Sequence, residues 1–568
     1  MNDKENIDNL RHSAAHLLAH AVLELYPGTK LTIGPTTKIG FFYDFLPPKN
    51  FTEADLLKIE AKMNELAKKD YKIVGKNISK KKARELFKDN EFKQELLDEI
   101  EDANVTIYCQ GDFCDLCKGG HVKSTGQIKY FKLTSVAGAY WRADKNKSAL
   151  QRIYGIAFFS QEELEDYLKK VEESKKYDHR KIGKQLNLFS FNVEAPGTPF
   201  FHHKGLIIYN QLIGYMRHML KKDYMEIKTP MIMNESLWKT SGHYDNYKEH
   251  IYFTKINETT YCVRPMNCPG GILIFKQRSH SYRQLPLRVA EYGHVYRYEL
   301  SGVLHGLFRV RSFTIDDAHI YCTSDQAENE VVKILDLAQN VYKKFGFEKV
   351  KMFVATMPKK HIGEKALWDK ATNALKNALE KKGFDYQIDE GEGAFYGPKI
   401  DMVIEDAIGR EWQCGTVQFD FFMPQNFKLE YIKSDQSKGV PIMIHRAIYG
   451  SIERFLGILL EHYKGKLPFW LSPIQARILT ITDQQKDYAQ QVYEKLLDKD
   501  VRVEIDKSGD QISAQIRNAQ LNYVPWMIVI GKKEQEKGTI TLRDLDGKQE
   551  FGIFVDDLIG RAQELCKY

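Results

Sequence analysis

The sequence contains no apolar run that approaches the roughly 18 residues a membrane-spanning helix needs. Its first ten residues, MNDKENIDNL, mix both charge signs and lack the apolar core of a signal peptide. Internal repeats and low-complexity tracts are also missing. These absences argue against a membrane or secreted protein, and we predict a cytoplasmic chain with no membrane partner.

Cysteine is scarce, with eight unevenly spaced residues in a chain of 568. Without a signal peptide, this usage favours a reducing compartment, so we predict thiols or metal ligands rather than disulfides. Cys114 and Cys117 form a Cys-x-x-Cys step, and the lack of a second such step argues against a zinc ribbon.

The bulk composition is that of a globular protein with several domains. Its length predicts three or four domains at roughly 150 residues each, and 43% hydrophobic residues suffice for ordinary cores. The net charge of +7 is mild for this length. It permits a polyanionic partner without requiring one.

Histidines recur every four residues in an Ala- and Leu-rich stretch near the N-terminus. His12, His16 and His20 therefore lie on one face of a predicted helix. Cys117 and His121 form a second pair four residues apart. The two groups could meet as four metal ligands or as a polar hydrolytic pocket, and the pattern alone does not decide between them.

The following segments favour helices. Helical patterns cover residues 53–69 and 80–101, and residues 161–184 are highly charged with almost no Gly or Pro. The last segment predicts a solvated connecting helix at a domain boundary. After an amphipathic helix at 204–223, Pro230 interrupts a strand, which is typical of a sheet edge and of an interface.

Strand-like segments dominate residues 240–463, and the helices at 326–345 and 364–382 are excursions from them. This pattern predicts an α+β domain with a large antiparallel sheet. Beyond Pro473, short apolar strands alternate with helices. That rhythm predicts a compact, mostly parallel α/β domain of about 95 residues.

Residues 288–323 predict a β-hairpin with a long polar connection that carries several arginines. Arginine forks bind phosphate oxygens in pairs, so a polyphosphate ligand suits this hairpin, and an exposed charged hairpin is the alternative. A later turn at Gly450 and Ser451 starts a helix with Arg454 in its first turn. A helix N-terminus of this kind favours phosphate.

Several motifs then follow in a distinctive order. They are MNCPG with Cys268, RYELSG and FRVRSF with Arg297, Glu299 and Arg309, DDAH with Asp317 and His319, and HRAIYGSIERF with His445 and Arg454. Together they resemble the motifs of class II aminoacyl-tRNA synthetases, and within that class the threonyl-tRNA synthetase family. The resemblance runs from His12 to about the end of the chain.

The resemblance implies a multidomain α+β protein built on the antiparallel class II catalytic sheet. The implied parts are an α+β editing domain at 1–160, a linker helix at 161–184, a catalytic domain at 185–468 and an α/β anticodon-binding domain at 469–568. The expected form lacks the small N-terminal domain that many relatives carry. A homodimer is implied by the motif around Pro230.

The implied reaction is ATP-dependent ligation of L-threonine to tRNA(Thr) through threonyl-adenylate, with Mg²⁺ accompanying ATP. One zinc ion per subunit would be held by Cys268, His319 and His445, which leaves an open position for the amino group and hydroxyl of threonine. Asp317 would accept a hydrogen bond from that hydroxyl.

The family assigns further roles by position. Arg297 would bind the α-phosphate and the acyl carboxylate, Glu299 the adenine edge, and Arg309 with Arg454 the outer phosphates. His243 would lie near the terminal ribose of the tRNA. The remaining matches are Tyr396, Lys399, Gln413 and Gln418 in the amino-acid and adenylate pocket, and Glu534 and Arg543 at base-reading positions.

Selectivity explains why two sites are expected. A site that binds the threonine hydroxyl rejects isosteric valine by about 10⁴-fold or more, whereas serine lacks only a methyl group, worth roughly 1–3 kcal/mol. Serine therefore requires a hydrolytic editing site that removes it from seryl-tRNA(Thr). The resemblance assigns that role, without a metal, to His12, His16, Cys117, His121 and Asp115.

The sequence departs from the family at a few positions. Ile315 replaces the usual glutamine, the loop has RYELSG instead of RNEPSG, and MNCPGG lacks the usual final histidine. Another class II ligase, or a non-catalytic RNA-binding regulator with this fold, are the alternative hypotheses. The intact zinc and arginine positions argue against both.

Overall fold

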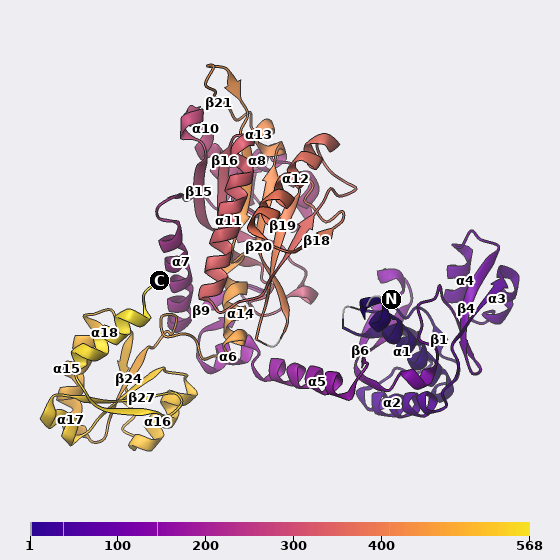
Figure 1. Ribbon diagram of the computed structural model, residues 1–568, viewed down its shortest axis with the longest axis horizontal. Helices are drawn as coiled ribbons and strands as arrows, with labels where there is room; N and C mark the ends of the chain where they lie inside the picture. The colour runs from indigo at the N-terminus through magenta and orange to yellow at the C-terminus, as the bar shows by residue number, and fades with distance from the viewer. Residues whose placement is uncertain (1–2, 38, 145, 408) are drawn as a thin grey trace. The chain divides into compact units, whose positions relative to one another are not determined.

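The computed structural model describes residues 3–37, 39–144, 146–407 and 409–568 (Figure 1). The chain divides into two compact units, of which one ends at Glu172 and the other begins at Glu173. This boundary falls inside the predicted linker. None of the helices in the described ranges has the length and apolar character needed to cross a membrane.

Unit 1 packs two helices, α1 (Asp3–Leu25) and α2 (Glu53–Lys68), against an antiparallel sheet. The sheet has the order β1-β2-β7-β6, with β1 (Lys30–Leu31), β2 (Phe41–Leu46), β7 (Ala149–Phe158) and β6 (Tyr130–Tyr140). Leucines and alanines three and four apart on α1 are fully buried, because that spacing turns one helical face to the sheet. His12, His16 and His20 lie on this largely buried helix.

A second, smaller sheet of unit 1 carries the second half of the predicted editing residues. It consists of β3 (Val74–Ser79), β4 (Asn104–Gln110) and β5 (Phe113–Leu116), with α3 (Lys80–Leu86) and α4 (Glu91–Asp98) beside it. The helical stretch predicted at 80–101 is thus two helices. Asn90 causes the break, since its side chain accepts from the amides of Phe92 and Lys93 and caps α4.

The prediction that the cysteines are thiols or metal ligands is wrong for two of them. Cys109 and Cys114 form a disulfide with an S–S distance of 2.06 Å. They face each other directly in the β4–β5 hairpin, which brings their side chains together across the ladder. The other six cysteines are free, including Cys117.

The predicted linker forms two helices, α5 (Gln161–Lys176) and α6 (His179–Gln185). Asp178 starts the second helix, because its carboxylate accepts from the amide of Arg180 as an N-cap. The predicted single helix is therefore interrupted just after the boundary between the two units.

Unit 2 is built on an eight-stranded sheet with the order β10-β15-β16-β23-β20-β19-β17-β18. Its five inner pairings are antiparallel and its two outer pairings are parallel, which confirms the predicted large antiparallel sheet. The strands are β10 (Met225–Glu226), β15 (Leu287–Tyr296), β16 (Ser312–Cys322), β23 (Ile442–Ala447), β20 (Glu411–Asp420), β19 (Lys399–Glu405), β17 (Val350–Ala355) and β18 (Tyr386–Asp389).

The main core of unit 2 lies between this sheet and four helices. These are α7 (His203–Leu220), α11 (Ser324–Lys344), α12 (Lys365–Lys382) and α14 (Ile452–His462). Smaller elements around the sheet include β8 (Phe189–Phe191), β9 (Pro199–Phe201), α8 (Glu235–Thr240), α9 (His243–Tyr247), β12 (Tyr252–Ile256), β13 (Thr259–Val263), α10 (Cys268–Lys276), β14 (His280–Ser281), α13 (Phe422–Asn426), β21 (Tyr431–Ile432) and β22 (Lys438–Gly439).

The predicted hairpin and the predicted broken strand are both present. β15 and β16 pair in antiparallel register and leave residues 297–311 as their connection. The strand around Pro230 is divided into β10, at the edge of the main sheet, and β11 (Ile232–Asn234), which pairs with β13. Proline has no amide to donate, so the ladder stops there.

The C-terminal part has a five-stranded sheet with the order β25-β24-β26-β27-β28. Its strands and helices are β24 (Ala476–Thr480), α15 (Lys486–Leu497), β25 (Val503–Ile505), α16 (Ile512–Leu521), β26 (Trp526–Ile530), α17 (Lys532–Lys537), β27 (Ile540–Asp544), β28 (Gln549–Ile553) and α18 (Val555–Leu565).

The prediction of a mostly parallel C-terminal sheet is only half right. β24 pairs in parallel with β25 and β26, whereas the β26–β27 and β27–β28 pairings are antiparallel. Residues 531–539 join β26 to β27, which is shorter than the dozen or more residues that a parallel crossover needs. The short connection therefore reverses the strand direction.

Candidate functional site

One row across the main sheet gathers four of the predicted site residues. His319 on β16 faces His445 on β23, His445 faces Gln418 on β20, and Gln418 faces Lys399 on β19. Directly paired residues of antiparallel strands point to the same face. The row therefore places two predicted zinc ligands and two predicted substrate-binding residues side by side on rigid strands.

Cys268 completes a cluster of three metal-ligand types at one end of this row. One ligand atom each from Cys268, His319 and His445 lie within 4.8 Å of one another. Cys268 is the first residue of α10, and the residue is 5% exposed. Burial raises the pKa of this thiol, so a bound cation would be needed to hold it as a thiolate.

Asp420, at the end of β20, orients His445. Its Oδ2 lies 2.9 Å from Nε2 of His445, while its Oδ1 accepts from the amides of Phe422 and Met423. An ionised carboxylate can only accept, so His445 donates through Nε2 and presents its Nδ1 lone pair. A carboxylate behind a histidine is the arrangement that orients metal-ligating imidazoles.

Asp317 lies on the same face, two residues before His319. Its Oδ2 accepts from Nδ2 of Asn267 at 2.7 Å, and burial raises the pKa of the carboxyl. Asn267 packs over Gly293, where a Cβ would lie 2.0 Å from its Oδ1. Gly293 thus makes room for the amide that fixes Asp317.

The predicted amino-acid and adenylate residues lie beside the metal-ligand cluster or along the same strands. The hydroxyl of Tyr396 donates to Oε1 of Gln418 at 3.0 Å, and its ring lies 5.6 Å from that of His445. Lys399 pairs with Asp401 at 2.6 Å. A bulge at position 414 turns Gln413, which is exposed, to the same face of β20 as Gln418.

His243 is fully buried at the start of α9, within ring contact of Tyr396. Its Nδ1 lies 2.8 Å from the hydroxyl of Ser241, and its Nε2 has no hydrogen-bond partner among the described residues. Burial, with smaller contributions from His445 and Arg297, lowers the pKa of His243 to about 3. The imidazole is therefore neutral and has one ring nitrogen available for a ligand.

The four predicted ATP-binding side chains come from the hairpin connection and from α14. Nε of Arg297 donates to the carbonyl of Pro265 at 3.1 Å. Arg309 and Glu299 pair with each other at 2.8 Å, so adenine and phosphate would have to compete with this exposed pair. Arg454 is in the first turn of α14, where the hydroxyl of Ser451 accepts from its amide.

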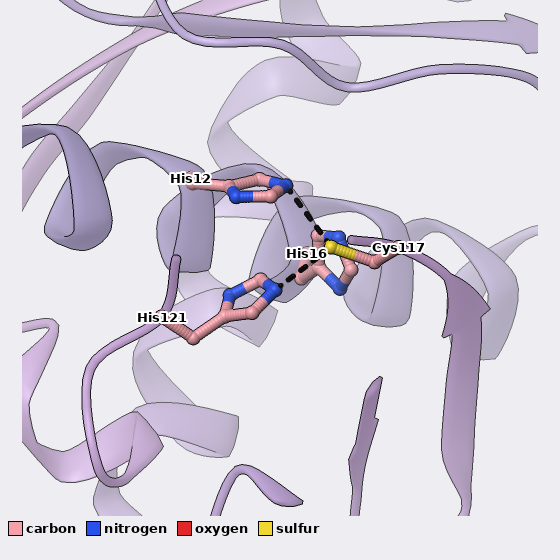
Figure 2. Close-up of side chains that lie close together, drawn as sticks. All are labelled: His12, His16, Cys117 and His121. Carbon is pink, nitrogen blue, oxygen red and sulfur yellow. Dashed lines mark hydrogen bonds between the residues drawn. The ribbon is translucent and has the colours of Figure 1, made fainter. Parts of the chain in front are cut away.

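Unit 1 brings together the two histidine and cysteine groups that the sequence singled out (Figure 2). One ligand atom each from His12, His16, Cys117 and His121 lie within 4.8 Å of one another. The sulfur of Cys117 lies 3.5 Å from Nε2 of His12 and 3.2 Å from Nε2 of His121. The rings of His12 and His121 stack at 4.3 Å.

Ser13 fixes the tautomer of His121. The hydroxyl of Ser13 donates to the carbonyl of Asn9 and accepts from the amide of Val122. Its only proton is then used, so Nδ1 of His121, at 3.1 Å, donates to it. Nε2 of His121 therefore points its lone pair at Cys117.

Burial keeps the histidines of this cluster neutral. It lowers the pKa of His12 and His16, and with the neighbouring histidines it lowers the pKa of His121 to about 2. The pKa of the Cys117 thiol is raised by burial. Neutral imidazoles and a neutral thiol can accept or relay protons from a water molecule.

Asp115 belongs to a buried ion pair beside the cluster. Its carboxylate lies 2.5 Å from Nζ of Lys93 and accepts at 2.5 Å from the hydroxyl of Tyr43. Lys93 and Asp115 are 2% exposed. Together with His12, His16 and Cys117 of the cluster, Lys93 and Asp115 line an open cavity of about 1210 Å³.

Comparison with known proteins settles the family. Three family models match: the class II tRNA synthetase core domain (G, H, P, S and T) at 252–463, the anticodon binding domain at 475–565, and the threonyl and alanyl tRNA synthetase second additional domain at 105–154. The threonine–tRNA ligase of Thermotoga maritima is 51% identical over 554 residues, which cover 97% of this chain and 86% of that protein. The chain belongs to the threonyl-tRNA synthetase family.

Other relatives agree. The threonine–tRNA ligase of Desulfatibacillum aliphaticivorans is 49% identical over 562 residues, covering 99% of this chain and 88% of that protein. A crystal structure described as the RNA binding domain of threonyl-tRNA synthetase from Cryptosporidium parvum matches with a TM-score of 0.67 and 43% identity. The match covers 68% of this chain and 98% of the chain in that crystal structure. The class II core and the editing-related domain predicted from the sequence are confirmed.

The two predicted anticodon residues of this threonyl-tRNA synthetase family member differ in their contacts. Glu534 caps α17 by accepting from the amide of Gly531 at 2.9 Å, and it also accepts from the hydroxyl of Thr541. Arg543 lies on β27 and its Nε has no hydrogen-bond partner among the described residues. Base reading by this pair stays a prediction.

Reasoning from the sequence missed four residues that shape the sites. Asp420, Asn267, Lys93 and Tyr43 are polar residues without a distinctive spacing, and Lys93 lies in a lysine-rich helical segment typical of a surface. For Asp420, the only signal was its place two residues after Gln418 on a predicted strand, which turns it to the same face.

Proposed function

We propose that this chain ligates L-threonine to tRNA(Thr) through threonyl-adenylate, selects threonine with a zinc ion at Cys268, His319 and His445, and hydrolyses seryl-tRNA(Thr) in unit 1. The observation that carries the proposal is the row of His319, His445, Gln418 and Lys399, backed by Asp420.

The donor set fits zinc. A thiol and two imidazoles approach one another within 4.8 Å, and His445 is oriented by a carboxylate. Two carboxylates, Asp317 and Asp420, lie near enough to raise the pKa of Cys268 further, so a cation is favoured there. When bound, zinc with three protein ligands supplies a Lewis acid with an open position for the amino group and hydroxyl of threonine.

The neighbouring side chains provide the rest of the selection. Asp317, held by Asn267, would accept from the threonine hydroxyl, and valine would leave this buried carboxylate without that partner. Tyr396 and Gln418 would border the side chain of the substrate. Lys399 and Gln413 belong to the adenylate side of the pocket in this proposal.

The arginines provide the charge for adenylate formation. Arg297 and Glu299 follow β15 directly, Arg309 precedes β16, and Arg454 is in the first turn of α14. In the proposed complex, Arg297 binds the α-phosphate and the acyl carboxylate, whereas Arg309 and Arg454 bind the outer phosphates. Fixed guanidinium groups stabilise the negative charge that develops on the phosphate oxygens when the adenylyl group of ATP is transferred to the carboxylate of threonine.

Mg²⁺ is expected to arrive with ATP. His243 would then act on the terminal ribose, where its unpartnered Nε2 can accept the proton of the attacking hydroxyl. Burial keeps the imidazole neutral, so this nitrogen presents a lone pair, although the lowered pKa makes it a weaker base than an ordinary histidine.

Hydrolysis is assigned to the cavity of unit 1. His12, His16, Cys117 and His121 offer neutral acceptors for a water molecule. Asp115, paired with Lys93, keeps a charged pair at the wall of the same cavity. The size of the cavity suits the acylated end of a tRNA.

A homodimer through the segment around Pro230 is also part of the proposal. Met225, Met231 and Ile232 are 52%, 40% and 52% exposed beside the free edge of β10. A strand edge flanked by exposed apolar side chains is typical of an interface. We retain the cytoplasm as the proposed compartment and the four-part division of the sequence as the proposed domain organisation.

The test is amino-acid-dependent exchange of pyrophosphate into ATP by the zinc-loaded protein, with threonine, serine and valine in parallel. Threonine is expected to give the fastest exchange, serine slower exchange and valine almost none. Exchange with another amino acid would favour a different class II ligase, and RNA binding without any exchange would favour a non-catalytic regulator.

A further inference from the structure

The fully buried histidine at the start of α6, His179, uses both of its ring nitrogens. Its Nε2 lies 3.0 Å from the amide of Leu307, and its Nδ1 lies 2.6 Å from Oε1 of Glu461 on α14. A backbone amide can only donate, so Nε2 accepts and Nδ1 carries the proton that is donated to Glu461. Neither nitrogen is left to bind a metal.

Leu307 belongs to the turn that presents Arg309. The amide of Phe308 donates to the carbonyl of His305 at 2.9 Å, and the amide of His305 donates to the carbonyl of Arg309 at 3.1 Å. Gly306, inside this turn, has a φ of +49°, and a Cβ there would lie 2.1 Å from Nε2 of His179. The turn therefore depends on glycine both for its backbone conformation and for its close approach to the histidine.

The same turn rests on α14. A Cβ at Gly457 would lie 3.0 Å from the ring of Phe308 and 3.3 Å from the side chain of Leu307. The ring of Phe308 lies 4.1 Å from that of His179. The turn is thus packed between the first residue of α6 and the middle of α14, and the hydrogen bond from the amide of Leu307 to His179 ties its backbone to α6.

Glu461 joins this contact to the linker. It accepts from the amide of His179 at 2.9 Å and pairs with Arg410 at 2.5 Å. Arg410 in turn donates to the hydroxyl of Ser174, near the end of α5. The network connects the segment that follows the unit boundary with the helix that carries Arg454.

We propose that His179 is a positioning residue for ATP, acting through the amide of Leu307 on the turn that holds Arg309. The inference rests on the proposed role of Arg309 at the outer phosphates. Loss of the acceptor leaves a buried amide unpaired and releases the turn, so ATP is bound less well. The residues proposed to contact threonine come mainly from the sheet strands, from α10 and from the start of the connection, and none of them belongs to the turn at residues 305–309.

Two substitutions separate the two nitrogens. The amide of Asn replaces the Nδ1 position, whereas that of Gln reaches the Nε2 position. His179→Asn therefore keeps a donor for Glu461 and loses the acceptor for Leu307, and His179→Gln keeps an acceptor for Leu307.

Pyrophosphate exchange is measured with each variant as a function of ATP and, separately, of threonine. His179→Asn is expected to raise the KM for ATP about tenfold, the effect of an unsatisfied buried amide, with the KM for threonine changed less than about twofold. His179→Gln is expected to restore most of the ATP affinity. In Gly306→Ala, the added Cβ would displace the same turn. This variant should therefore also raise the KM for ATP much more than the KM for threonine.

Equal rises of both KM values, or equal behaviour of the Asn and Gln variants, would show a merely structural histidine and overturn the proposal. Wild-type protein without threonine-dependent exchange would instead refute the proposed function. The two failures are therefore distinguishable.

Discussion

Two clusters of cysteine and histidine, one in each unit, differ in what stands behind them. In unit 2, His445 is backed by the carboxylate of Asp420, and the cluster joins His319 and His445 on two paired strands to Cys268 at the start of α10. In unit 1, His121 is backed by the hydroxyl of Ser13, and the cluster is shared between a helix and a loop. Only the first arrangement raises the negative charge available to a metal.

The surrounding charge makes the same distinction. Beyond burial, the carboxylates of Asp317 and Asp420 raise the pKa of the Cys268 thiol, while Arg297 acts in the opposite direction. In unit 1 the nearby carboxylate, Asp115, is already paired with Lys93. In unit 2, the two carboxylates would therefore balance the positive charge of a divalent cation. In unit 1, the Lys93–Asp115 pair has no net charge and would not balance it. Although both clusters contain the same ligand types, cysteine and histidine, we therefore propose a metal site in unit 2 and a hydrolytic pocket in unit 1.

The strongest way to break the comparison is to remove the sulfur from unit 2. Cys268→Ala is expected to lower threonine-dependent exchange about 1000-fold or more, because the Lewis acid loses a ligand. The control is Cys322→Ala, which removes a buried free thiol from the same strand as His319. Equal exchange in the two variants would contradict the assignment.

Removal of the Cys117 sulfur from unit 1 should impair deacylation and leave threonine activation intact, which is the reverse of the effect expected for Cys268→Ala. Cys117→Ala is expected to slow deacylation of seryl-tRNA(Thr) about 100-fold, the scale of a lost acid–base or water-positioning group, without changing threonine-dependent exchange. His12→Ala should behave alike. Cys566→Ala, a free and similarly half-buried thiol, serves as the control. Unchanged deacylation in Cys117→Ala would remove this cluster from the editing mechanism.

The carboxylate behind His445 can be tested by a nearly isosteric change. Asp420→Asn is expected to weaken zinc binding by about tenfold to a hundredfold, as loss of a partner behind a metal ligand does. The readout is zinc retention against a competing chelator. Ser13→Ala, the corresponding change in unit 1, should leave zinc retention as it is. Identical losses in both variants would mean that the backing groups do not distinguish the clusters.

The smallest effect concerns pH. The pKa of His121 is about 2 in the folded chain, against 6.5 ordinarily. The unfolded chain therefore binds the extra proton first, and stability falls as the pH drops below about 6.5. His121→Asn removes this contribution, so its Tm should fall less than that of the wild type between about pH 7 and about pH 4.5. A steeper fall in the variant would have the wrong sign.

The sequence predicted what periodicity and motifs carry, such as the hairpin of β15 and β16 and the grouping of Cys268, His319 and His445, whose role as zinc ligands stays a prediction. It did not predict Asp420 or Lys93, because their importance comes from the register of strands and from burial. The disulfide of Cys109 and Cys114 was missed for the same reason, since only the hairpin pairing places them face to face. His179 looked like part of a charged linker until α14 and the hairpin turn were seen to enclose it.

The central claim is that the metal belongs to the sheet cluster alone. Its most direct test is the zinc content per chain of the wild type, Cys268→Ala and Cys117→Ala, measured by mass spectrometry after exhaustive dialysis. The account predicts about one zinc ion, almost none and about one, respectively. Two ions in the wild type, or a loss of zinc in Cys117→Ala with retention in Cys268→Ala, would contradict it.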